Sequence, residues 1–226
     1  MNKKWCSIAL AGVLAAGLLC GCGESAPEVN EKAQDPNATI EEMILGKWHD
    51  RITDETIGMR QDGTFRGNKK SQGEYKILDD QTIRLAETEV SFWVEGDFMC
   101  FYNAGRDVTP PDYSVRVNPT KVAAEDVVGT WTAYADPDYT IVDGTVTFYD
   151  DGTSEADNDK MAEGEYTLLA DEDGNNMMYF DSDTLEDYET EMVAAAGDLV
   201  WIDPAGKEIY FLVRTGDAES KTDSES

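Results

Sequence analysis

The sequence has few of the residues from which enzyme sites are usually built. It contains one histidine, His49, and no Ser, Cys or Thr in a recognisable nucleophile motif. It also lacks a Gly-rich phosphate loop and a His/Cys cluster with metal-ligand spacing. Acidic pairs are so frequent that their spacing singles out no general acid and base. We therefore expect a protein that is not an enzyme and has no cofactor, with His49 an ordinary strand residue.

Basic residues are also scarce. The chain has 18 Lys and Arg against 47 Asp and Glu, a formal net charge of −29. Nucleic-acid binding and direct adhesion to anionic lipid are disfavoured, because both need basic patches. The imbalance is concentrated in one half of the chain. Residues 39–119 contain 10 basic and 15 acidic residues, whereas residues 120–215 contain 4 and 24.

Only one apolar run is long, and it lies at the N-terminus. Two lysines precede the uncharged segment 8–19, which is shorter than the ~18 residues of a membrane-spanning helix and typical of a signal-peptide core. The run ends in Leu19-Cys20-Gly21-Cys22, which resembles the box at which bacterial lipoproteins are cut. The resemblance implies a signal peptide over residues 1–21 and lipidation, including palmitate, at Cys22.

Two alternatives are Cys20 as the lipidated residue and an ordinary secretory signal with incidental cysteines. In the lipoprotein interpretation the protein is extracytoplasmic and anchored to the cell membrane, since acyl chains contribute about 0.8 kcal/mol per buried CH₂. Residues 22–38 have no aromatic and almost no aliphatic side chain, which predicts a flexible tether. The acidic residues 216–226 are expected to be a disordered tail.

Cysteine is nearly absent from the rest of the chain. Cys6 and Cys20 would leave with the signal peptide and Cys22 would carry lipid, so Cys100 alone remains. An exported protein with one thiol has no internal disulfide. Cys100 lies in the apolar run 98–102, and we expect it to be a buried, inert core residue.

Three short motifs occur twice in the same order. The first copy has Gly46-Lys47-Trp48, Asp62-Gly63-Thr64 and Gly73-Glu74-Tyr75, and the second has Gly129-Thr130-Trp131, Asp151-Gly152-Thr153 and Gly164-Glu165-Tyr166. The offset between the copies grows from 83 to 89 to 91 residues, as loop insertions into a duplicated domain would produce. We therefore predict two tandem domains, at residues 39–119 and 120–215, of which the second is acidic.

Within each copy the pattern is that of short strands behind a helical turn. Residues 39–42 have a capping-box pattern, and residues 125–128 follow at the corresponding place in the second copy. Apolar and polar residues then alternate with period two, as in 90–94 and 146–148, and Asp-Gly pairs mark turns. Seven or eight strands per copy without a long amphipathic helix predict an all-β fold of two tandem small antiparallel β-barrels.

We expect these barrels to be filled by their own side chains, although an eight-stranded barrel can also hold one small ligand. The aromatic residues that would fill the core or line such a cavity are Trp48, Tyr75, Phe92, Phe98, Trp131, Phe148, Tyr166 and Phe180. Trp93 lies opposite Phe92 and Val94 in the alternation. It is therefore expected to face outward, either against a partner or against the second copy.

The Gly-x-Trp motif behind a short helical turn resembles the opening of the lipocalin and calycin barrels. Its order with Asp-Gly-Thr and Gly-x-Tyr is similar to that in lipocalin-like domains of uncharacterised bacterial lipoproteins. In the lipocalin family an Arg on or just after the last strand packs across the Trp. The resemblance covers nearly all of residues 40–215, and the motif residues that it implies are Gly46, Trp48, Arg116, Gly129, Trp131 and Arg214.

A calcium site is a weaker alternative, because calcium binds six to eight oxygens and one region is rich in them. The candidate ligands there are Asp171, Asp173, Asp181 and Asp183. The spacing of an EF-hand fails, because the sixth position from Asp171 is Asn176 and the twelfth is Ser182. Hairpin turns with solvated acidic residues are the preferred interpretation.

Together these features lead us to expect a non-enzymatic binding or interaction module of the cell envelope. Its acidic second domain would engage a cationic protein or ions, with charge complementarity acting on encounter rate and selectivity. The alternatives are a carrier of a small apolar ligand in a barrel cavity and a calcium-binding envelope protein.

Overall fold

The computed structural model describes residues 30–102, 112–157, 163–181, 188–203 and 208–218. The first copy contains α1 (Ile40–Met43), β1 (Gly46–Asp50), β2 (Glu55–Met59), β3 (Thr64–Gly67), β4 (Gln72–Asp79), β5 (Thr82–Leu85), β6 (Thr88–Glu95), β7 (Phe98–Tyr102) and β8 (Asp112–Arg116). The second contains α2 (Ala124–Val127), β9 (Gly129–Tyr134), β10 (Val142–Phe148), β11 (Thr153–Ala156), β12 (Gly164–Ala170), β13 (Asn176–Asp181), β14 (Tyr188–Ala195), β15 (Asp198–Asp203) and β16 (Glu208–Gly216).

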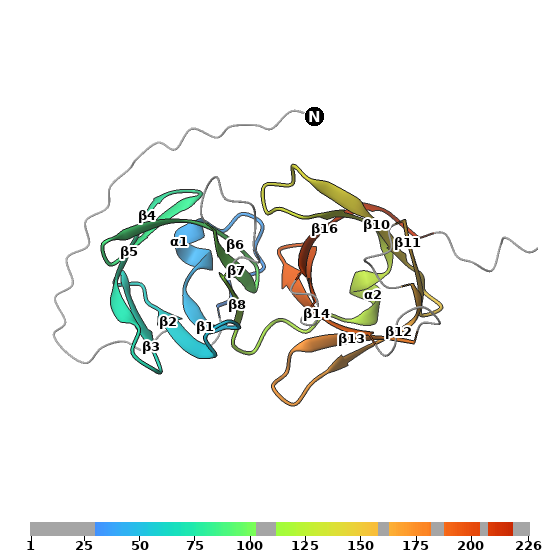
Figure 1. Ribbon diagram of the computed structural model, residues 1–226, viewed down its shortest axis with the longest axis horizontal. Coiled ribbons are helices and arrows are strands. Elements are labelled where there is room, and N and C mark those ends of the chain that lie inside the picture. The colour runs from blue at the N-terminus through green and yellow to red at the C-terminus, as the bar shows by residue number, and fades with distance from the viewer. Residues whose placement is uncertain (1–29, 103–111, 158–162, 182–187, 204–207, 219–226) are drawn as a thin grey trace, which may run out of the picture.

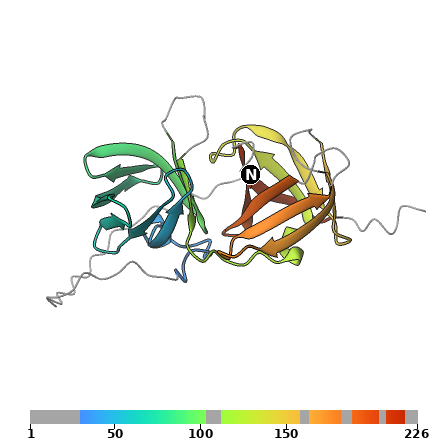
Figure 2. The same ribbon diagram turned by 60° about the horizontal axis from the view of Figure 1, so that its bottom comes forward.

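Each set of eight strands closes into an antiparallel barrel. Strands that follow one another in the chain pair, and the first strand of each set pairs with the last. Figure 1 shows the two barrels beside each other, and Figure 2 shows α1 and α2 on the same side of the pair. The prediction of two tandem antiparallel barrels, each behind a short helical turn, is confirmed.

The repeated Asp-Gly-Thr motif forms the same turn in both barrels. Asp62 Oδ1 accepts hydrogen bonds from Thr64 N at 2.9 Å and from Thr64 Oγ1 at 2.6 Å, and Asp151 accepts from Thr153 at the same two distances. The intervening glycine has a φ of +79° in the first copy and +82° in the second, a region that favours glycine. The motif recurs because this turn needs a short acceptor followed by a residue without Cβ.

The Gly-Glu-Tyr motif holds the same turn from the neighbouring strand. The Tyr75 hydroxyl donates to the carbonyl oxygen of Arg60 at 2.6 Å, and the Tyr166 hydroxyl donates to that of Tyr149 at 3.0 Å. Each tyrosine therefore packs its ring against the core of its own barrel, and its hydroxyl fixes the turn through a hydrogen bond to a backbone carbonyl.

Each barrel is packed along its axis with its own side chains. In the first barrel Trp48, Ile83, Phe92 and Met99 form one buried cluster with Ile44, which follows α1. The cluster in the second barrel is larger and includes Val127, Trp131, Val146, Phe148, Tyr166, Met178, Phe180, Met192 and Trp201. This packing follows from the period-two alternation, since every second residue of a strand faces inward.

A third apolar cluster joins the two barrels. Its buried members from the first barrel are Phe98, Cys100 and Val115, and those from the second are Val193, Ala195, Val200, Ile202, Ile209 and Phe211. Phe98 therefore faces the second barrel, and its expected place inside the first barrel is wrong. The reason is that β7 buries both faces, with Met99 inside its barrel and its two neighbours between the barrels.

Trp93 is covered by the second copy. Its ring centroid lies 5.0 Å from that of Phe211, and the two rings are nearly perpendicular. Cys100 is fully buried in the same cluster, and burial raises the pKa of its thiol. Both residues face out of the first barrel and pack in the contact with the second, where Cys100 is fully buried and Trp93 is half-buried.

Polar contacts also cross between the barrels. Arg51 Nη2 donates to Glu191 Oε1 at 2.5 Å and to Asn175 Oδ1 at 2.9 Å. The backbone N–H of Asp97 donates to the carbonyl oxygen of Ala194 at 2.9 Å. Ion pair, backbone bond and apolar cluster together fix the orientation of one barrel against the other.

The segment before α1 is folded too. Asn30 Nδ2 donates to the carbonyl oxygens of Glu42 at 2.7 Å and Leu45 at 2.9 Å, which satisfies backbone groups at the end of α1. Ala33 is buried at 3% exposure. These contacts hold residues that the composition assigned to the flexible tether.

Gln34 connects this segment to both barrels. Its Nε2 donates to Asp97 Oδ2 at 3.0 Å, and its Oε1 accepts from Ala196 N at 2.9 Å.

Residues 22–29 of the predicted tether and 219–226 of the predicted tail lie outside the described residues, whereas Gly216 belongs to β16. Within the described part of the chain, no helix has the length and apolarity to cross a membrane.

Candidate functional site

Trp48 and Arg116 close one end of the first barrel. The guanidinium carbon lies 4.1 Å from the centroid of the Trp48 ring. Arg116 Nη1 and Nη2 donate to the carbonyl oxygens of Leu45 at 2.7 Å and Met43 at 2.8 Å, while Nε donates to Asp97 Oδ1 at 2.9 Å. The ion pair is buried, with side chains 4% and 1% exposed. One residue thus ties the last strand to α1, to the first strand and to the turn before β7.

Trp131 and Arg214 repeat this arrangement in the second barrel, with one difference. The guanidinium carbon lies 4.4 Å from the ring centroid, and Nη1 and Nη2 donate to the carbonyl oxygens of Val128 at 2.6 Å and Asp126 at 2.5 Å. Asp198 stands where the first barrel has its buried acid. Among the described contacts, however, its Oδ1 accepts the backbone N–H of Arg214, at 3.4 Å, and no guanidinium bond.

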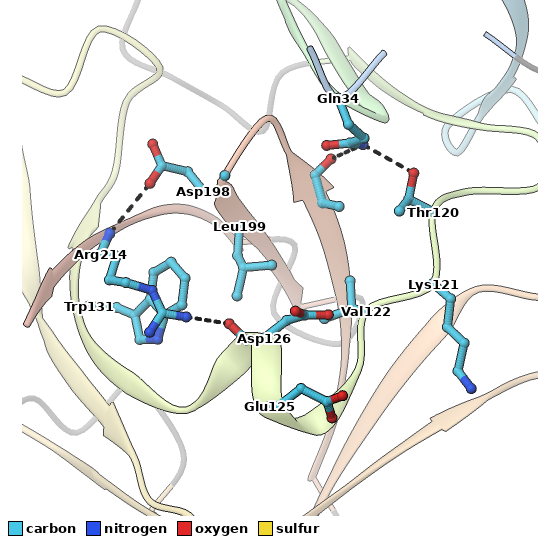
Figure 3. A pocket seen from close by; sticks show the side chains of 12 residues that line it. Gln34, Thr120, Lys121, Val122, Glu125, Asp126, Trp131, Asp198, Leu199 and Arg214 are labelled. Atoms are coloured by element: carbon cyan, nitrogen blue, oxygen red, sulfur yellow. Dashed lines mark hydrogen bonds between the residues drawn. The ribbon is translucent and has the colours of Figure 1, made fainter. Parts of the chain in front are cut away.

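A pocket of about 350 Å³ opens at this place (Figure 3). The apolar part of its lining consists of Val122, Trp131, Ala194 and Leu199. The polar part consists of Gln34, Thr120, Lys121, Glu125, Asp126, Gly197, Asp198 and Arg214. The pocket therefore has a hydrophobic base and charged groups of both signs.

Two carboxyl groups near this region titrate above their ordinary range. Burial raises the pKa of Asp198, against the opposing effect of the hydrogen bond from Arg214. Burial and the neighbouring Asp198 raise the pKa of Glu95 to about 7. Tyr139 of the second barrel donates its hydroxyl to Glu95 Oε2 at 3.3 Å, so this group of the first barrel titrates in the contact between the two.

A second candidate is the outer surface of β12, β13 and β14. Its exposed residues, which we call the acidic face, are Glu165, Thr167, Leu169, Tyr179, Asp181 and Glu189. Glu165 pairs directly with Asp181 across the strands, and Tyr179 pairs with both Thr167 and Glu189. In the described chain no ion pair joins its three carboxylates to a basic residue.

The first barrel has the same surface with different charges. There Lys76 pairs with Arg84, and Arg84 pairs with Glu89. The register places Thr167 and Tyr179 of the second barrel at the positions of these two cations. Both barrels therefore carry acidic residues on this surface, but the second barrel has uncharged residues at the two basic positions of the first.

The remaining predicted site residues do not gather into a site. His49 lies half-buried on β1, with Nε2 3.5 Å from Asp54 Oδ1. Asp171 uses its carboxylate within its own turn, accepting from the N–H groups of Asp173 and Asn175. In the described part of the chain no three His, Cys, Asp or Glu residues are grouped so as to hold a metal ion.

The calcium candidates are dispersed. Asp173 is exposed in the turn of Asp171, Asp181 lies at the end of β13, and Asp183 is outside the described residues. Cys22 is outside them as well.

The sequence indicated two residues of the pocket, Trp131 and Arg214, but the neighbouring Asp198 was not predicted. A signal was present, because Gly96-Asp97 recurs as Gly197-Asp198 at an offset of 101 residues.

Comparison of the chain with protein-family models, with curated proteins and with solved structures finds no match.

Proposed function

We propose that the protein is a lipid-anchored extracytoplasmic lipoprotein with lipocalin-like barrels, which acts without catalysis as a binding module of the cell envelope. The signal-peptide pattern and the lipoprotein box at Cys22 support the anchor. The acidic face of the second barrel supports a cationic protein as the partner. The membrane anchor would keep the paired barrels in the compartment where that partner is found.

The acidic face is the observation that carries this proposal. Glu165 and Asp181 lie directly opposite each other, and like charges in such a pair are destabilising unless a counter-charge is nearby. Tyr179 and Leu169 are 40% and 56% exposed on the same face, so it offers apolar contact as well as charge. Such a surface suits a basic segment with interspersed apolar residues, which would be attracted quickly and selectively.

The apolar carrier receives less support. Large side chains occupy the interior of each barrel, where an apolar ligand would have to bind. They include Trp48 and Phe92 in the first barrel and Trp131, Phe148 and Trp201 in the second. The calcium alternative also receives less support, because the Asp171 carboxylate already accepts hydrogen bonds from its own turn.

Binding of fluorescent hexalysine to the full-length protein in detergent tests the acidic face. We expect affinity to fall steeply with salt, and the double variant Glu165→Gln/Asp181→Asn to bind about three- to tenfold more weakly. Glu74→Gln is the matched control, since Glu74 precedes Tyr75 as Glu165 precedes Tyr166. Equal losses in the two variants, or binding that does not respond to salt, would contradict the proposal.

The anchor is tested separately. Cys22→Ser should abolish lipid attachment, measured as the mass of the purified chain and as its loss from the membrane fraction. Cys20→Ser is the control and should leave both unchanged. Lipid retained on the Cys22→Ser chain and lost from the Cys20→Ser chain would move the lipidation site.

A further inference from the structure

The barrel end next to the short helix, where Arg116 and Arg214 lie, differs between the two barrels. In the first barrel the Asp97 carboxylate is saturated: Oδ1 accepts from Arg116 Nε at 2.9 Å, and Oδ2 accepts from Gln34 Nε2 at 3.0 Å and Thr120 N at 2.6 Å. Asn30 adds three hydrogen bonds to the carbonyl oxygens next to α1. This end is closed and its polar groups are paired.

The same end of the second barrel is open. Arg214 keeps its place over Trp131 and its two backbone bonds, but in the described chain its Nε forms no hydrogen bond. Arg214 is exposed, whereas Arg116 is 4% exposed. The guanidinium therefore has N–H groups for an acceptor that comes from outside the chain. In the first barrel the equivalent acceptor is the Asp97 carboxylate, so a carboxylate is the group that this guanidinium position is suited to bind.

The charges around the pocket restrict the ligand further. Arg214 and Lys121 are cations, and Glu125, Asp126 and Asp198 are acids. A simple anion would meet three carboxyl groups, and a simple cation would meet two basic ones. Asp198 and Arg214 are adjacent, since the acid accepts the backbone N–H of the arginine. Figure 3 shows both on the same side of the pocket, with Lys121 across from them.

The pocket is also small and partly apolar. A volume of about 350 Å³ lies at the small end of ligand pockets. Val122 and Leu199, each 4% exposed, give the pocket an aliphatic base. A molecule that fits would be small, with one short apolar group and two opposite charges close together.

We propose that this pocket binds a free α-amino acid with a small or medium aliphatic side chain. Its carboxylate is bound by the Arg214 guanidinium, in the manner of Asp97 on Arg116, and its ammonium group by Asp198. Lys121, across the pocket, adds only a long-range attraction for the carboxylate, and Leu199 and Val122 contact the side chain. The pocket lies at the α2 end of the barrel, and this proposal does not depend on the acidic face.

Calorimetric titration of the full-length protein in detergent with L-leucine tests the proposal. Two analogues each remove one charge: 4-methylpentanoate lacks the amino group, and 3-methylbutylamine lacks the carboxylate. We expect leucine to bind and each analogue to bind at least about tenfold more weakly, because each leaves one charged partner unpaired. Binding of either analogue as tightly as leucine, or no binding of leucine or alanine, would overturn the proposal.

Variants locate the site. Asp198→Asn should weaken leucine binding about tenfold, and Lys121→Ala should weaken it less, about two- to fivefold. Lys76→Ala is the control, since Lys76 is an exposed lysine on β4 of the other barrel. Circular dichroism should show the same fold in all three. Unchanged leucine affinity in folded Asp198→Asn would refute the assignment.

Discussion

Gly96 of the first barrel lies against the backbone of Ala194 in the second, so closely that a Cβ on Gly96 would come within 2.3 Å of the Ala194 carbonyl oxygen. The two barrels therefore meet backbone to backbone at one turn. That contact allows a sharp test of the packing between them.

Gly96→Ala should separate the barrels, whereas the equivalent Gly197→Ala should not. Both positions have positive φ, +59° and +109°, so each alanine is strained by about 1–2 kcal/mol. Only Gly96 also faces a clash, because a Cβ on Gly197 would meet nothing within 4 Å. Small-angle X-ray scattering should show a larger radius of gyration for Gly96→Ala alone. An equal radius in both variants would mean that this turn does not hold the barrels together.

Arg51→Met should lower the free energy of unfolding by about 3 kcal/mol, since it leaves Glu191 buried without its partner. The Glu191 side chain is 10% exposed, and burial already raises its pKa. The matched control is Arg84→Met, which breaks an ion pair whose side chains are 44% and 54% exposed. Its cost should be at most about 1 kcal/mol. Urea unfolding compares the two, and adding Glu191→Gln to Arg51→Met should recover part of the loss.

The Glu95 carboxyl should make stability depend on pH. Its pKa is about 7 in the folded protein, against an ordinary value of 4.5 for a solvated glutamate, first because it is buried and second because Asp198 is near. The folded protein therefore holds this proton more tightly than the unfolded chain does. The contribution to stability is full below pH 4.5 and is lost as pH rises towards 7.

Glu95→Gln removes this titration. The difference in melting temperature between the variant and the unchanged protein should shift in favour of the variant from pH 4.5 to 7 and then level off. A flat difference for Glu95→Gln would show that the carboxyl titrates normally.

Arg116→Lys and Arg214→Lys should differ although the two arginines have equivalent roles. The first substitution replaces a buried guanidinium, which bonds Asp97 and three carbonyl oxygens, by an ammonium group without its planar fork of donors, and should cost about 3–5 kcal/mol. The second removes two backbone bonds of an exposed side chain and should cost about 1–2 kcal/mol. Chemical denaturation measures both, and equal losses would show that the second barrel end is as closed as the first.

The repeated motifs predicted much of the fold because they act locally. Asp62 and Thr64 make their turn through bonds two residues apart, and period-two alternation sends Phe92 and Val94 to one side of a strand and Trp93 to the other. Such relations are contained in a few consecutive residues. Two copies in the same order therefore indicated two barrels, and the Gly-x-Trp resemblance indicated the arginines over Trp48 and Trp131.

Alternation determined the direction of Trp93 out of its barrel, but only the tertiary structure decided that Phe211 covers it. The same holds for Phe98, which faces the second barrel, and for Gln34, whose polar composition suggested a loose tether but whose amide joins both barrels. The pocket beside Arg214 depends on a missing bond to Asp198, although Arg116 and Asp97 form that bond in the first barrel. The sequence by itself determined the strands, turns and inward faces, because those follow from neighbouring residues. Contacts between barrels and the open end of one of them follow from residues up to about 160 positions apart, which no local pattern records.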